Sequence, residues 1–163
     1  MAKRFYIFCP NIYDISHSDL LWGGIMTCLP QVQGERDATR AVLNFIAMIV
    51  PKATPSQEYG SILVNACIGA LIGQTVSMLI PAYADCLFAL ILHDLVRAQE
   101  WVHRVIPTLS QNKQIVCSVM EILFPMIAKD GPKSKSRAKM LLVDMSKICN
   151  GESTTDAFLT YSL

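Results

Sequence analysis

The stretch of residues 35–50 constrains the fold of this chain more than any other part of the sequence. Its apolar residues recur three or four positions apart, the spacing that places them on one face of an α-helix. The first row consists of Ala38, Val42, Phe45, Ile46 and Ile49, and the second of Leu43, Ala47 and Val50. The second row widens the stripe until little of the helix can face water. Because Gly34 precedes the stretch and Pro51 follows it, the sequence predicts a helix that needs neighbours on two sides.

The rest of the chain supplies further segments of the same kind, joined by short turns that contain proline or glycine. Helical apolar spacing predicts helices over 11–29, 61–80, 82–93, 95–109, 111–128 and 136–149, after the tail of another that ends at Pro10. No segment has the alternating pattern of a strand, so the sequence predicts an all-α protein of about seven helices. Broad-striped antiparallel helix pairs are typical of an α-solenoid of HEAT or armadillo type. We expect one such domain over residues 1–150 and a flexible C-terminal tail over 151–163.

Residues 61–80 require a second interpretation, because they carry no charge and are long enough to cross a bilayer. Gly69 and Gly73 form a GxxxG motif, which brings helices close together in membranes. Polar residues such as Asn65 and Gln74 dilute the hydrophobicity, and no Lys or Arg cluster flanks either end. A buried helix of a helical array is therefore favoured, and a small membrane-embedded helical protein is the alternative.

Composition narrows the classes of partner. Hydrophobic residues make up 52% of the chain and charged residues 17%, against a usual charged share of about 25%. A chain this apolar packs against more protein or enters a membrane. The net charge of +1 provides no attraction to nucleic acid, so no direct nucleic-acid partner is expected. The six cysteines form no CxxC pair, which favours buried, reduced thiols of a cytosolic or nuclear protein over disulfides or a zinc site.

The sequence contains no recognisable catalytic constellation. His93 and His103 lack the i,i+4 spacing of a helical metal pair, and no nucleophile elbow, phosphate-binding glycine loop or HExxH motif occurs. We therefore expect no enzymatic activity, no cofactor and no metal site.

Three residues are candidates for contact with a partner protein. Arg36 and Asp37 begin the helix of residues 35–50, where they can meet a partner; alternatively, Asp37 stabilises the helix dipole and Arg36 bridges to a neighbouring repeat. Trp101 can anchor a partner as an exposed aromatic side chain. Since Val102 and Val105 beside it are apolar, packing in the core is the alternative.

A basic cluster supplies the other candidates, Lys133, Lys135, Arg137 and Lys139. Such a cluster can bind an acidic cargo surface or a phosphate group. The alternative is a solvated loop and first helical turn, in which Asp130 weakens the positive field.

Two segments resemble the C-terminal HEAT repeats of transportin-SR-like nuclear transport receptors, which belong to the importin-β superfamily. They are LLWGGIMTCL at 20–29 and, after a short loop, GERDATRAVLNFIAMIV at 34–50. In the second segment, Arg36, Asp37 and Ala38 match the family's Arg-Asp-Ala sequence, and Phe45 matches its helix phenylalanine.

The order of the later segments is also similar to that family. A helix that is nearly free of charge leads to Pro81-x-Tyr83, then to Ala84-Asp85, to a stretch with Trp101, and to two terminal helices of which Lys113-Gln114 begins the first. The resemblance extends over about residues 2–150 and implies that the chain is a C-terminal piece of a longer receptor that starts in the middle of a solenoid.

By this resemblance, the full receptor carries protein cargo through nuclear pores, is controlled by the GTPase Ran, shuttles between cytoplasm and nucleus, and performs no covalent chemistry. In the family, the Ran contacts lie largely in N-terminal repeats. The Arg-rich helix that holds phosphorylated cargo lies before the matching region, and no such helix occurs in this sequence. The resemblance therefore leaves the cargo and the direction of transport open.

A chain cut from a solenoid would expose an apolar N-terminal end, because a repeat buries its apolar face only against its neighbours. We therefore expect either self-association through residues 1–29 or refolding of the N-terminal segment onto itself. Changing Phe5, Ile7 and Phe8 to Ser should abolish that association in light scattering. An unmodified chain that is a compact monomer and binds no hydrophobic dye would contradict this expectation.

Overall fold

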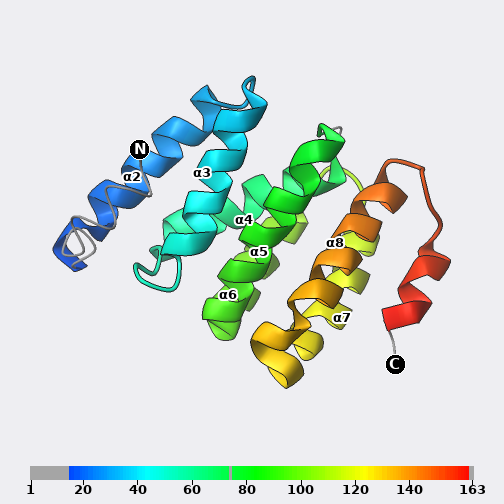
Figure 1. Ribbon diagram of the computed structural model, residues 1–163. Coiled ribbons are helices and arrows are strands. Elements are labelled where there is room, and N and C mark those ends of the chain that lie inside the picture. The colour runs from blue at the N-terminus through cyan, green and yellow to red at the C-terminus, as the bar shows by residue number, and fades with distance from the viewer. Residues whose placement is uncertain (1–14, 74, 162–163) are drawn as a thin grey trace.

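The fold is all-α throughout the part of the chain that the computed structural model describes, residues 15–73 and 75–161 (Figure 1). Its α-helices are α2 (Ile15–Gln31), α3 (Arg36–Ile49), α4 (Gln57–Ile72), α5 (Ile80–His93), α6 (Leu95–Val105), α7 (Lys113–Asp130) and α8 (Lys135–Cys149). Short 3-10 helices follow or connect them: η2 (Ser77–Leu79), η3 (Ile106–Thr108), η4 (Gly131–Ser134) and η5 (Thr155–Tyr161). These ranges contain seven α-helices and no strand, so the prediction of an all-α helical-repeat fold is confirmed.

The helices lie side by side in two layers. In Figure 1, α3, α5 and α8 form the front layer, and both α3 and α8 contact α5. Behind them, α4 packs against α5 and α6, and α7 packs against α8. At one end of the array α2 packs against α3 and α4. Helix α5 thus has neighbours in its own layer and behind it, which makes it the centre of the core.

Helix α3 follows the predicted pattern closely. It runs from Arg36 to Ile49, and the flanking Glu35 and Val50 are its N-cap and C-cap. Its buried residues are Thr39, Leu43, Phe45, Ile46 and Ile49. Thr39 is polar but satisfied, because its hydroxyl donates a 2.6 Å hydrogen bond to the carbonyl of Val32. The wide apolar stripe therefore packs α3 between α2 and α5, as its sequence requires.

The predicted single helix over 61–80 is wrong. Helix α4 begins earlier, where the side chain of Ser56 caps it by accepting from the N–H of Tyr59, and it ends at Ile72. Gly73 takes an extended conformation with a ψ of −177°, and the chain turns through η2 before α5 begins. Both helices are apolar, so the composition gave no sign of the break between them. Within residues 15–73 and 75–161, no helix combines the length and the apolar character that crossing a membrane requires.

Two helices contain a proline near their C-terminal end, and both extend slightly beyond the ranges expected from the sequence, 11–29 and 111–128. Helix α2 runs one residue past Pro30, and α7 continues past Pro125 to Asp130. The carbonyl that loses its donor at Pro125 belongs to Glu121, a residue on the exposed side of α7. Gly151 follows the C-cap of α8 with a φ of 75°, a conformation that ends a helix and favours glycine.

The segment after α8 differs from the flexible tail expected over residues 151–163. Phe158 and Tyr161 of η5 are buried against α8, and the Tyr161 hydroxyl donates a 2.6 Å hydrogen bond to Oδ2 of Asp144. Burial, reinforced by this bond to Asp144, raises the pKa of the Tyr161 phenol, so it remains a neutral donor. The two aromatic residues are three positions apart, the period of a 3-10 helix, and so share one face.

The apolar N-terminal patch that includes Phe5, Ile7 and Phe8 lies outside the described residues. Self-association through this end therefore stays a prediction.

Helices α4 and α6 come so close that only glycine fits between them. Trp101 of α6 is 1% exposed, and its indole N–H donates a 3.0 Å hydrogen bond to Oε1 of Gln57. Its ring lies over Gly60, where an added Cβ would be 2.2 Å from the ring atoms Cε2 and Cζ2. This contact fixes α6 on α4.

We expect Gly60→Ala to destabilise the protein by roughly 1–3 kcal/mol, because the new methyl group must displace the Trp101 ring. Gly69 is the matched control in the same helix, since a Cβ there would meet nothing within 4 Å. Gly69→Ala should raise the free energy of unfolding by about 0.5–1 kcal/mol through helix propensity alone. Denaturant melts of both variants measure these effects, and equal shifts would contradict the close contact at Gly60.

Candidate binding groove

The predicted pair at the start of α3 lies on the surface. Arg36 is exposed, and its Nη1 lies 3.5 Å from Sδ of Met78 in η2. Asp37 has a fully exposed side chain and forms a long ion pair with Arg40, with Nη1 and Oδ1 4.0 Å apart. Arg36 thus bridges to the turn before α5, and Asp37 stands in the first turn of α3, where it favours the helix dipole.

Two of the four residues of the predicted basic cluster form ion pairs with α5. On the inner side of α8, Lys139 Nζ lies 2.6 Å from Oδ2 of Asp85, and Lys135 Nζ lies 3.7 Å from Oδ1 of the same carboxylate. Lys133 and Arg137 remain exposed on η4 and α8. Lys135 and Lys139 therefore join α8 to α5 through Asp85, which is the acidic residue of a mostly apolar helix.

Trp101 belongs to the core and not to a binding surface. Its 1% exposure and its contact with Gly60 leave no face for a partner. Of the two interpretations that the sequence left open, the structure supports packing in the core.

The cysteines of the described ranges are free, as the sequence predicted. Cys67 and Cys86 are buried in the contact between α4 and α5. A hydrogen bond to Cys86, together with burial, raises the pKa of the Cys67 thiol well above its usual value, so it stays protonated and unreactive. Cys28 of α2 differs from the prediction of buried thiols, because it is exposed.

A groove separates α6 from α7. Helix α6 is held against α4 and α5, whereas α7 is held against α8 and α5, and the chain crosses between them through η3. The space that results has a volume of about 430 Å³. Its lining comes from Gln99, Val102, His103, Ile106 and Pro107 on one side and from Cys117, Met120, Glu121, Phe124 and Pro125 on the other.

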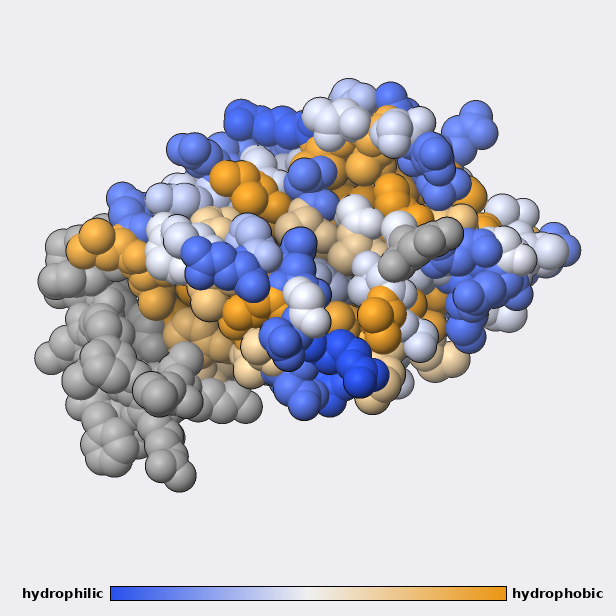
Figure 2. Space-filling view, turned by 90° about the horizontal axis from the view of Figure 1, so that it is seen from above, coloured by the Kyte–Doolittle hydropathy of each residue, from blue (hydrophilic) through white to orange (hydrophobic). Residues whose placement is uncertain are grey.

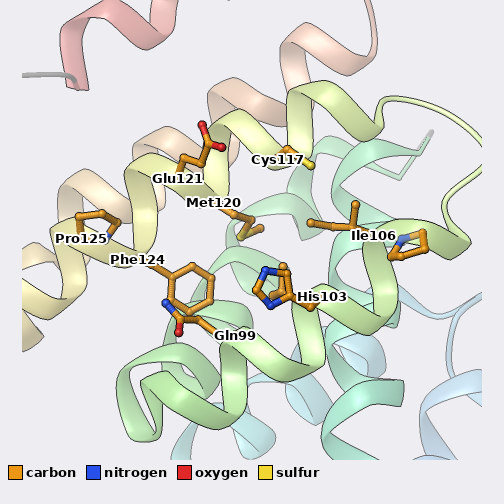
Figure 3. Close-up of a pocket in the computed structure, with 10 residues that line it drawn as sticks. Gln99, His103, Ile106, Cys117, Met120, Glu121, Phe124 and Pro125 are labelled. Atoms are coloured by element: carbon orange, nitrogen blue, oxygen red, sulfur yellow. The ribbon is translucent and has the colours of Figure 1, made fainter.

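The floor of the α6–α7 groove is apolar and its edges are polar. Val102, Met120 and Phe124 are largely buried, while Glu121 and His103 are exposed at the two edges. Figure 3 shows His103 of α6 facing Met120 and Phe124 of α7 across the gap. A methionine and a phenylalanine on such a floor offer an adaptable apolar contact.

Two prolines add hydrogen-bond acceptors to the walls of this groove. Pro125 has no N–H to donate to the carbonyl of Glu121, and Pro107 has none for the carbonyl of His103. Glu121 and His103 both line the groove. One edge therefore carries the Glu121 carboxylate, and the backbone carbonyls of both residues lack the usual helical donor.

Elsewhere the exposed apolar side chains are dispersed. Among the described residues, the large ones are Leu20, Ile62, Val76, Met78, Val96, Met140 and Leu159. On the face seen in Figure 2, polar side chains divide the apolar surface into separate areas. The α6–α7 groove is thus a place where apolar side chains gather in a concave site, the form that binding sites usually take.

Sequence reasoning did not find this groove. Its floor residues fall within the ordinary apolar stripes of the helices predicted over 95–109 and 111–128. The available signal was Pro107 and Pro125, one in each of these predicted helices.

No group of three or more His, Cys, Asp or Glu side chains placed to hold a metal ion occurs in the described part of the chain. No family model, no curated protein and no solved structure matches this chain.

Proposed function

We propose that this chain is a protein-binding helical-repeat module, the C-terminal part of a nuclear transport receptor of the importin-β superfamily. Such a receptor carries protein cargo through nuclear pores under the control of Ran and shuttles between cytoplasm and nucleus. The proposal for the receptor rests on the resemblance of residues 20–29 and 34–50 to that family. It is supported by the two-layer stacking of the helices, which suits a segment of a longer array.

The observation that carries protein binding is the groove between α6 and α7. Its apolar floor and polar edges have the anatomy of a protein interface, in which a desolvated centre is surrounded by a hydrated rim. The concave floor offers Met120 and Phe124 to an incoming side chain, and the edge residues Gln99, His103 and Glu121 can orient it.

A second candidate is a small helical-bundle interaction protein, free-standing or embedded in a membrane. One observation favours the free-standing form: α6 follows α5 after the single residue Asp94 and packs on α4 and α5, so it is an additional helix between the pair α4–α5 and the pair α7–α8. In that case the protein would still bind partners, but it would not be part of a receptor controlled by Ran.

Proximity labelling in cells tests the choice between these functions. A labelling enzyme joined to the end of the endogenous gene should enrich Ran and nuclear-pore proteins over the same enzyme expressed free in cytoplasm and nucleus. The transcript should also continue upstream of the codon for Met1 with further helix pairs. Enrichment of membrane proteins without Ran or pore proteins would contradict the proposal and favour the embedded alternative. An in-frame stop codon directly upstream would contradict the proposal that the chain is part of a longer receptor.

A further inference from the structure

We infer that the α6–α7 groove binds an amphipathic helix of a partner protein that presents apolar side chains to the floor and an arginine to Glu121. The inference rests on the proposed protein-binding function and specifies the partner's chemistry. It is argued from the shape of the groove, the hydrogen-bonding groups of its walls, and its charge.

The shape and the walls favour a helix over an extended peptide. Both walls are helices, whose backbone groups are mostly bonded within the same helix, so they present no ladder of N–H and C=O groups to an extended chain. The backbone groups of a bound helix are hydrogen-bonded within that helix, so it needs only side-chain contacts with the walls. A volume of about 430 Å³ accommodates a few apolar side chains, which a helix presents at i, i+3, i+4 and i+7.

The charge of the groove favours a basic partner. Glu121 is the one formally charged residue among those that line it, with His103 taken as neutral. Lys113 stands at the Pro107 end of the groove, where its Nζ donates a 2.9 Å hydrogen bond to the carbonyl of Pro107 and keeps its positive charge. The lining residues themselves include no Lys or Arg that would repel a cation at Glu121.

Arginine fits this edge better than lysine. Its guanidinium carries several N–H donors in one plane, and the Glu121 edge offers a carboxylate together with the backbone carbonyl that Pro125 leaves without a donor. An arginine at this edge can pair with the Glu121 carboxylate through two parallel N–H groups, which a lysine cannot do.

The probe is a synthetic, fluorescein-labelled helical peptide with leucines along one face and arginine beside them. Fluorescence anisotropy with the full chain measures its binding. Its controls are the same peptide with glutamate in place of arginine, and a peptide of equal composition with the leucines spread around the helix. The arginine peptide should bind best. A fourth peptide with the sequence of residues 1–14 tests whether the chain's own end occupies the groove.

Charge reversal at the groove is the decisive variant. Glu121→Lys should weaken binding of the arginine peptide about tenfold and should improve binding of the glutamate peptide. Glu152→Lys is the matched control. Glu152 is exposed in the turn after α8, so this substitution makes the same change of charge away from the groove. It should leave both affinities unchanged.

Alkylation locates the bound peptide independently of affinity. Cys117 lines the groove and is half-buried, whereas Cys28 is exposed on α2. The arginine peptide should slow alkylation of Cys117 by N-ethylmaleimide several-fold, measured by mass spectrometry, and leave Cys28 unaffected.

Four results would overturn the inference: no binding of the arginine peptide, equal binding of the peptide with spread leucines, equal effects of the two charge reversals, or no protection of Cys117. Tighter binding of the peptide of residues 1–14 would also overturn it, because the groove would then belong to the chain's own end. None of these results would alter the proximity labelling of Ran and pore proteins, so the proposed function can stand if the groove assignment fails.

Discussion

The structure depends on the burial of α5. Almost every residue of this helix is apolar, and eight of its side chains are buried: Ala82, Tyr83, Ala84, Cys86, Leu87, Phe88, Leu90 and Ile91. A helix that is apolar nearly all round must have neighbours on nearly all sides. Helices α3 and α8 cover it within its layer, and α4, α6 and α7 contact it from the second layer. The acidic residue of α5, Asp85, is neutralised by Lys139 and Lys135 of α8. Ion pairs and apolar contacts therefore both hold α8 against α5.

The groove follows from the way the second layer is fixed. Trp101 packs over Gly60 and holds α6 on α4, while α7 is placed by its contact with α8. These two attachments lie on opposite sides of the gap, and the chain between them passes through η3 without bringing α6 and α7 together. The same glycine contact that stabilises the core therefore also leaves Met120 and Phe124 at the bottom of an open space.

The sequence predicted the elements whose signal is local. The apolar period and the flanking glycine and proline located α3 to within one residue at each end. The break between α4 and α5 was missed, because it lies between two apolar helices and depends on the extended backbone of Gly73. The docking of η5 was missed because it depends on Asp144, seventeen positions before Tyr161. Trp101 and the groove depend on contacts between helices, which the period of a single helix does not specify.

Native-state hydrogen exchange tests the central position of α5 most directly. If α5 is the helix on which the others depend, its amides should exchange slowest, and the core amides of α3, α4 and α8 should approach the same limiting free energy of opening. The exposed ends of α2 and η5 should exchange through smaller openings. Slower exchange in α7 and α8 than in α5, or separate limiting values for the two ends of the array, would contradict a single core centred on α5.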